Sequence, residues 1–235
     1  MADFLTAEWR KLAFANYVIN PEVLLKYVPK GTELDSFNGQ YYVSLVGFKF
    51  CNTCLKGFRI PFHTDFEEVN LRFYVRYKEN DLWKRGVVFI KEIVPKPAIT
   101  FVANTIYKEN YATMPMRHSW TETEKSLNVS YSWKSKTWHH FEIEADREPI
   151  EITSGSREEF ITEHYWGYAQ ASASRTSEYE VQHPRWQLYP VKSYNIEVDF
   201  GQVYNPEFSF LNNRQPETVF LAEGSEISVK PGKFF

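Results

Sequence analysis

Residues 69–77 carry the pattern that most restricts the fold, because apolar and polar side chains alternate there without a break. The apolar positions are Val69, Leu71, Phe73, Val75 and Tyr77, and the polar positions are Asn70, Arg72, Tyr74 and Arg76. A period of two predicts a β-strand with one buried face and argues against a helix.

Similar strand signals recur along the chain, at residues 40–50, 86–94, 121–136, 138–145, 166–168, 178–183 and 186–191. In 121–136 the alternating apolar positions predict a half-exposed strand rather than a hinge. Strands at this density predict a mainly β (α+β) fold, in which an antiparallel or mixed sheet closes into a barrel or a sandwich. Because neither a linker nor an internal repeat interrupts the pattern, we expect a single domain over residues 1–235.

Only three segments favour helices. Residues 21–27 follow Asn20 and begin with Pro21, which suit the cap and the first position of a helix. Residues 99–111 show apolar side chains at helical spacing, and residues 156–163 begin with Ser156 and carry Glu159 three positions later, the spacing of a capping box. We therefore expect a few peripheral helices around the sheet.

Composition excludes several classes of partner. Hydrophobic residues make up 43% of the 235 residues, which is enough for a packed core, and the formal net charge of −3 provides no field that would attract nucleic acid. No apolar run is long enough for a membrane helix, the N-terminus lacks the basic start of a signal peptide, and two cysteines make no disulfide framework. We expect a cytoplasmic protein that binds neither nucleic acid nor membranes.

Motifs that would identify a common enzyme are absent: there is no glycine-rich phosphate loop, no nucleophile elbow and no zinc-binding helix. Cys51 and Cys54 have the spacing of a zinc half-site, but a structural zinc site needs two further ligands and only His63 is near in sequence. We interpret the pair as two ordinary thiols in a loop after a strand, and expect no metal and no cofactor.

The polar face of 69–77 has two interpretations. Facing solvent, Asn70, Arg72 and Arg76, preceded by Glu68, form a ladder of ion pairs that contributes little stability. Facing the lumen of a barrel, Arg72 and Arg76 form a clamp for a carboxylate or phosphate, since guanidinium offers a planar fork to planar anions.

Three other segments combine groups that suit proton transfer or anion binding. His63 lies among three carboxylates in 61–68, where it is either an acid–base group or part of a solvated loop. Glu163, His164 and Trp166 lie where a helix turns into a strand, so they line a pocket or form a packing corner. Arg185 follows His183 and Pro184 in an aromatic turn and is an anion contact in the functional interpretation.

Eight segments together resemble the YqjF-like proteins of unknown function. They are residues 9–12, 16–17, 29–35, 43–48, 61–63, 68–75, 163–168 (Glu-His-Tyr-Trp-Gly-Tyr) and 183–186 (His-Pro-Arg-Trp). The resemblance covers nearly the whole chain in the expected order. It implies an acetoacetate decarboxylase-like fold, a single domain around a cone-shaped β-barrel, and it implies a strand rather than a helix at residues 9–17. It also favours the lumen interpretation of Glu68 and Arg72.

The superfamily's named member forms a Schiff base through a lysine in a Tyr-Pro-Lys-Lys type stretch, to which residues 104–114 correspond by resemblance. Tyr111 falls near the position of the nucleophile, no lysine pair is present, and Lys108 lies about one helical turn away. Glu109 beside Lys108 opposes the low pKa that a Schiff-base lysine needs.

These observations lead to three hypotheses. In the first, the barrel binds a small carboxylate-bearing molecule. The ligand contacts are Arg72, Arg76, Asn70, Tyr111, Glu163, Trp166 and Arg185, and proton transfer falls to Glu68, His63 and His164. In the second, Lys108 or Lys91 forms a Schiff base with a keto acid. In the third, exposed aromatics such as Phe234 and Phe235 bind a partner or a second copy of the chain. The sequence leaves open whether the protein is an enzyme and whether it forms a homo-oligomer.

Overall fold

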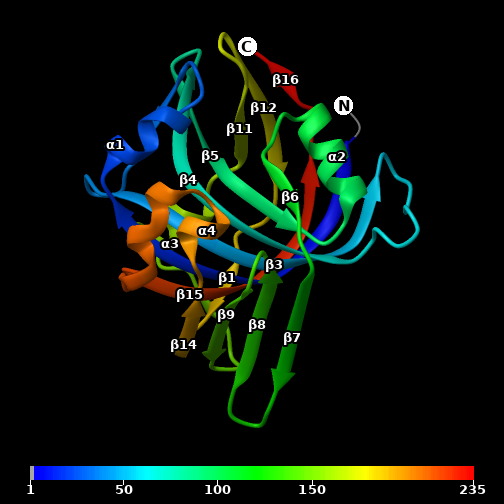
Figure 1. Cartoon of the computed structure of the whole chain (residues 1–235), viewed down its shortest axis with the longest axis vertical. Helices are drawn as coiled ribbons and strands as arrows, with labels where there is room; N and C mark the ends of the chain where they lie inside the picture. The colour runs from blue at the N-terminus through cyan, green and yellow to red at the C-terminus, as the bar shows by residue number, and fades with distance from the viewer. Residues whose placement is uncertain (1–2) are drawn as a thin grey trace.

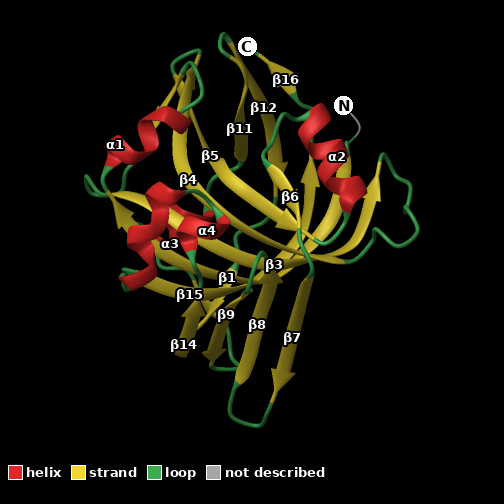
Figure 2. Cartoon of the chain, viewed as in Figure 1, coloured by secondary structure: helices red, strands yellow, loops and turns green. Residues whose placement is uncertain are grey.

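The computed structural model describes residues 3–235, so the first two residues used in the targeting argument lie outside it. Strands form most of the structure (Figures 1 and 2). Five of them are long and rich in apolar side chains. They are β1 (Leu5–Ile19), β3 (Tyr41–Leu55), β4 (Phe66–Glu79), β5 (Leu82–Val94) and β15 (Thr218–Val229).

The long strands belong to one strongly curved 12-stranded sheet (Figure 1). Its shorter members are β2 (Thr32–Leu34), β6 (Tyr111–Thr113), β10 (Ile150–Glu151), β11 (Trp166–Ser172), β12 (Arg175–Gln182), β13 (Gln187–Tyr189) and β16 (Lys233–Phe234). The main path runs β10-β13-β15-β1-β3-β4-β5-β11-β12-β16, and an additional pairing of β12 with β15 makes the path return on itself. The sheet therefore has an inner and an outer face, as the sequence predicted for a barrel-like architecture.

A second, four-stranded sheet covers the outer face. It has the order β14 (Val191–Glu197), β9 (Trp138–Ala145), β8 (Leu127–Lys134) and β7 (Met116–Glu122). Leu71 and Phe73 of the curved sheet share one apolar cluster with Val129 and Phe141 of the second sheet. The two sheets approach closely at Gly47, where a β-carbon would lie only 2.9 Å from the Tyr131 ring. The expected strand at 121–136 is thus the end of β7, a turn and β8, and its apolar positions are buried.

Helices are short and peripheral. They are α1 (Pro21–Leu24), α2 (Pro97–Ile106), α3 (Arg157–Thr162) and α4 (Phe200–Val203), with 3-10 turns η1 (Leu25–Tyr27) and η2 (Pro206–Asn213). The Asn20 and Ser156 side chains cap α1 and α3 as predicted. Glu159 departs from the expected capping box, because its carboxylate accepts a hydrogen bond from the backbone of Gly155 rather than Ser156. No helix within residues 3–235 is long and apolar enough to cross a membrane.

Strand β5 contains a β-bulge that determines which side chains enter the inner face. Arg72 of β4 pairs with Phe89 and Leu71 pairs with Lys91, so Ile90 is an extra residue without a partner in β4. Asn110 donates a hydrogen bond of 2.5 Å to the carbonyl of Ile90. The bulge shifts the alternation by one residue beyond this point.

Three expectations need correction. The helix predicted over 99–111 ends at Ile106, because Lys108 has a left-handed backbone (φ 62°) and Tyr111 begins β6. Cys51 and Cys54 lie at the end of strand β3 rather than in a loop, and both are free thiols. The C-terminal aromatics are not a free tail, because Lys233–Phe234 pairs with β12 and Phe235 stacks on Tyr77 at 4.3 Å between ring centroids.

Candidate functional site

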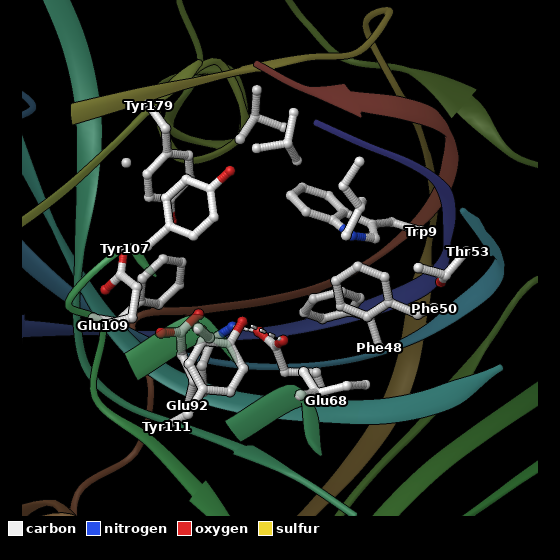
Figure 3. A pocket seen from close by; sticks show the side chains of 18 of the residues that line it. Trp9, Phe48, Phe50, Thr53, Glu68, Glu92, Tyr107, Glu109, Tyr111 and Tyr179 are labelled. Atoms are coloured by element: carbon white, nitrogen blue, oxygen red, sulfur yellow. Dashed lines mark hydrogen bonds between the residues drawn. The ribbon is translucent and has the colours of Figure 1, made fainter. Parts of the chain in front are cut away.

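A cavity of about 400 Å³ lies inside the curved sheet (Figure 3). This volume is in the range of pockets that hold small organic molecules. Helix α2 contributes Ala98, Ile99, Val102 and Ala103 to its lining. The wall is mostly apolar and aromatic, and its polar side chains come from strands and from the connections between elements. Strand β4 contributes Glu68, Asn70 and Arg72.

Strand alternation explains why these three side chains share the cavity wall. The intervening residues Val69 and Leu71 are fully buried against the second sheet, so the polar positions must face inward. Glu68, Asn70 and Arg72 therefore face the cavity, as the lumen interpretation of this strand predicted. All three are at least nine-tenths buried.

Glu68 lies at the centre of a hydrogen-bonded group. Asn70 Nδ2 donates to Glu68 Oε1 at 2.9 Å, and the Tyr111 hydroxyl donates to Glu68 Oε2 at 3.1 Å. Burial raises the pKa of Glu68 to about 7, against the lowering effect of these two donors and of Arg72. The carboxyl group therefore exchanges its proton near neutral pH, as an acid–base group requires.

Two further carboxyl groups lie at the same end of the cavity. The bulge in β5 turns Glu92 inward, and Glu109 reaches the cavity from the connection between α2 and β6 (Figure 3). Burial raises the pKa of Glu109 to about 8, and burial followed by repulsion from Glu109 and Glu68 raises that of Glu92 well above its usual value. Neither Glu92 Oε2 nor Glu109 Oε1 has a hydrogen-bond partner.

Arg72 is the only lysine or arginine among the cavity-lining residues. It is 8% exposed, and no carboxylate within residues 3–235 lies at ion-pair distance from it. Its Nε has no partner, and Nη2 makes a long contact of 3.5 Å with the carbonyl of Ile161. The guanidinium lies over the rings of Phe14 and Tyr74, at 5.2 and 5.8 Å from their centroids.

His164 lines the cavity from the turn between α3 and β11. Its Nε2 is 3.4 Å from Asp35 Oδ2, and Arg85 donates to the same oxygen at 2.7 Å. Neither ring nitrogen of His164 has a hydrogen bond of good geometry. Burial lowers the pKa of His164 to about 4, so the imidazole is neutral at neutral pH.

Aromatic side chains form the opposite end of the cavity (Figure 3). Trp9 contacts Phe48 and Phe50 edge-on, with ring centroids 5.3 and 5.9 Å apart. On the side of the cavity where Glu109 lies, Tyr179 lies directly over Gly167, where any β-carbon would overlap the phenol ring (Figure 3). The absence of a side chain at Gly167 is what allows Tyr179 to reach the cavity.

His63 and Trp166 also line the cavity but make different contacts. His63 is half-buried, and its Nδ1 is 2.8 Å from the carbonyl of Pro61. The Trp166 ring lies under Lys84, whose Nζ is 4.0 Å from the ring centroid. Both therefore join Glu68, Asn70, Arg72, Tyr111 and His164 at one cavity.

Three predicted ligand contacts are not brought to the cavity. Arg76 lies further along β4, where it pairs with Glu33 at 2.6 Å and stacks on Trp83. Arg185 pairs with Glu159 at 2.6 Å, and the Glu163 carboxylate accepts from Tyr165. None of the three is among the cavity-lining residues.

The two lysines considered for a Schiff base lie elsewhere as well. Lys108 is exposed, and Lys91 donates to the backbone carbonyls of Val203 and Tyr204 on the outer side of the sheet. No lysine lines the cavity. Within residues 3–235, no group of three His, Cys, Asp or Glu side chains is arranged to hold a metal ion.

Sequence reasoning missed Glu92, Glu109, Tyr107 and Tyr179, all of which line the cavity. One signal was available for Glu92, because a glutamate inside the otherwise apolar segment 86–94 is unusual in a buried strand. Glu109 had no comparable signal, since it lies in a polar connection.

The fold defines a class of protein. The structure resembles an acetoacetate decarboxylase from Legionella pneumophila (TM-score 0.64, 12% identity, 98% of this chain and 86% of that one). It also resembles an acetoacetate decarboxylase-like enzyme from Sphingomonas wittichii RW1 (TM-score 0.67, 8% identity, 100% and 94%). A third similar structure is the enduracididine biosynthesis enzyme MppR complexed with pyruvate (TM-score 0.66, 8% identity, 100% and 91%). At these identities the likeness concerns the fold, which is acetoacetate decarboxylase-like as the sequence predicted.

The sequence places the chain more narrowly. Residues 6–226 match the family DUF2071, described as an uncharacterized conserved protein, and the chain belongs to that family. The uncharacterized protein YqjF of Bacillus subtilis (strain 168) is 35% identical over 82 residues, which span 34% of this chain and 32% of YqjF. The resemblance to YqjF-like proteins is confirmed.

Proposed function

We propose that the protein binds a small organic molecule bearing a carboxylate, or another anionic oxygen, inside the curved sheet, with Arg72 as the anion partner. Glu68 and His164 exchange protons with the bound molecule. The activity is acid–base chemistry that uses no Schiff-base lysine.

The unpaired guanidinium of Arg72 carries the proposal. A buried charge without a counter-ion is unfavourable, and a ligand carboxylate would compensate it. Guanidinium presents two parallel N–H donors that match the geometry of a carboxylate. The free Nε of Arg72 and its poorly used Nη2 are therefore available to an anion in the cavity.

The acid–base part rests on two groups with different proton affinities. Glu68, with a pKa of about 7, is present in both forms near neutral pH, whereas His164, with a pKa of about 4, is neutral there and is the weaker proton acceptor of the two. His63 at the cavity wall is a third candidate. MppR, which shares the fold, binds pyruvate, a small carboxylate, and this supports the ligand class.

The decisive experiment compares two arginines of one strand. Arg72→Met and Arg76→Met are titrated calorimetrically with pyruvate and with saturated monocarboxylates of increasing chain length. We expect at least one carboxylate to bind the native protein and Arg76→Met equally. Arg72→Met should bind it at least ten-fold more weakly, because a charged hydrogen bond contributes about 1.5–3 kcal/mol. Unchanged binding by Arg72→Met, or no binding of any carboxylate to the native protein, would refute the proposal.

A second experiment addresses lysine chemistry. Borohydride reduction of the protein with pyruvate should leave no lysine adduct detectable by mass spectrometry, because no lysine lines the cavity. An adduct at Lys91 or Lys108 would instead support a Schiff-base mechanism.

A further inference from the structure

One end of the cavity, called here the carboxyl end, is formed by Glu68, Glu92 and Glu109. It contains buried acceptor atoms to which no donor is bound. Glu92 Oε2, Glu109 Oε1 and Asn70 Oδ1 have no hydrogen-bond partner, and the three side chains are 2%, 9% and 1% exposed. All three residues line the cavity. Buried acceptors are normally satisfied, so these three atoms are open to a ligand that brings N–H donors.

The donors that face this end are few, and apart from Arg72 they are uncharged. The Tyr107 hydroxyl has no hydrogen-bond partner, the Tyr179 hydroxyl lies beside Glu109, and two other donors are engaged. The Tyr111 hydroxyl and Asn70 Nδ2 both donate to Glu68. Arg72 is the one lysine or arginine on the cavity wall, and it forms no ion pair with any of the three carboxyl groups. Three acidic side chains therefore share a cavity with a single cation.

We propose that Glu92 and Glu109, together with the amide oxygen of Asn70, bind an organic cation, either a protonated amine or a guanidinium group. The ligand then carries a cationic group in addition to its carboxylate. The cation site is inferred from the unpaired atoms of Glu92, Glu109 and Asn70. It rests on the proposed function only for the carboxylate half of the ligand.

An organic cation fits these groups better than a metal ion. No three acidic or histidine side chains within residues 3–235 are spaced to coordinate one metal ion. An ammonium or guanidinium group instead offers three to five N–H donors over a wider span, and it tolerates acceptors that are further apart.

Proton release should accompany binding. The titratable and charged groups facing this end are Glu68 and Arg72 of β4, Glu92 of β5, Tyr107 and Glu109 after α2, Tyr111 of β6 and Tyr179 of β12. Burial raises the pKa of Glu109 to about 8, so that its carboxyl group is largely protonated at neutral pH. A bound cation favours the ionised form and expels that proton.

The test uses two molecules of the same shape, methylguanidinium and its neutral counterpart N-methylurea. Calorimetric titrations at neutral pH are run in phosphate and in MOPS, which differ in ionisation enthalpy and so report the protons released, and neither of which is a primary ammonium ion that would compete for the site. We expect millimolar binding of methylguanidinium with net proton release, an affinity that rises as the pH is raised from about 6 to 9, and at least ten-fold weaker binding of N-methylurea.

Matched variants locate the site. Glu92→Gln combined with Glu109→Gln should weaken methylguanidinium binding at least ten-fold and abolish proton release. Glu67→Gln should leave both unchanged, because Glu67 pairs with His118 at 2.6 Å and is not a cavity-lining residue. Circular dichroism confirms that each variant is folded, and each single variant, Glu92→Gln and Glu109→Gln, is measured in case the double variant is not.

The two proposals fail in different ways. Equal binding of methylguanidinium and N-methylurea, or no binding of either, overturns the cation site and leaves carboxylate binding by Arg72 intact. Conversely, loss of cation binding in the glutamine variants together with normal carboxylate binding by Arg72→Met supports the cation site and overturns the carboxylate function.

Discussion

The two faces of β4 are both buried but differ in chemistry. On the outer face Val69, Leu71 and Phe73 are fully buried in an apolar layer between two sheets. On the inner face Glu68 and Arg72 are almost as deeply buried, yet the charge of Arg72 has no counter-ion. One strand therefore combines a face that stabilises the fold with a face that costs stability, and such a cost is typical of binding sites.

The outer face should give the largest effect on stability. Phe73→Ala removes a fully buried ring and should lower the free energy of unfolding by about 3–5 kcal/mol, measured by urea denaturation. Carboxylate binding by the folded fraction should persist, because the side chain points away from the cavity. A loss below about 1 kcal/mol would mean that the two sheets are not tightly packed there.

The carboxyl end of the inner face should make stability depend on pH. The folded pKa of Glu109 is about 8 and its unfolded value is about 4.5, so its contribution is complete below pH 4.5 and is lost as the pH rises through 8. Glu109→Gln removes this loss. Its stability relative to the native protein should rise by about 2–4 kcal/mol from pH 5 to pH 9 in thermal or urea unfolding.

If the difference in stability between Glu109→Gln and the native protein is the same at every pH from 5 to 9, the raised pKa of Glu109 is contradicted.

His164 makes stability depend on pH at the acidic end of the range. Its folded pKa of about 4 lies below its unfolded value of 6.5, so it destabilises the fold as the pH falls from 6.5 towards 4. Comparing native protein and variant at each pH removes this common contribution.

Substitution of the unpaired Arg72 should raise the stability of the fold rather than lower it. Replacing a buried, uncompensated charge by an apolar side chain of similar length is often stabilising, so Arg72→Met should raise the free energy of unfolding by about 1–3 kcal/mol. Urea denaturation without ligand checks this. A marked destabilisation would show that the contacts of Arg72 with Phe14 and Tyr74 outweigh the cost of its burial.

The smallest effect is expected at Arg76. Its ion pair with Glu33 is exposed to solvent, so Arg76→Met should change stability by less than about 1 kcal/mol, and added salt should reduce even that difference. The measurement is urea denaturation at low and high ionic strength. A larger effect would mean that the two arginines of β4 differ less than their surroundings indicate.

Periodicity predicted on which face of β4 each residue lies, but not how far along the strand the cavity extends. Arg72 and Arg76 alternate in phase, and the sequence treated them as a pair. In the structure β4 extends beyond the cavity, and by Arg76 the strand has reached solvent and the Trp83 ring. Where the cavity ends along β4 depends on segments far away in the sequence, such as helix α3, whose Ile161 lies 89 residues from Arg72, and no local pattern reports it.

The fold itself was largely predictable, because it follows from local patterns and from the family resemblance. The strand at residues 9–17, the caps at Asn20 and Ser156 and the half-exposed strand around Val129 are confirmed. The carboxyl end of the cavity was not predictable, since Glu92 depends on a bulge and Glu109 on a connection. That residues 1–235 form one domain, and that the ligand contacts act as such, stay predictions.

The bulge at Ile90 has a consequence for the chemistry of this cavity. A strand that absorbed Ile90 into a regular ladder would turn Lys91 towards the cavity and Glu92 into the apolar layer, because a slip of one residue exchanges the two faces. An amine would then replace a carboxyl group beside Tyr111. In this chain the bulge at Ile90 therefore decides whether residue 91 or residue 92 faces the cavity.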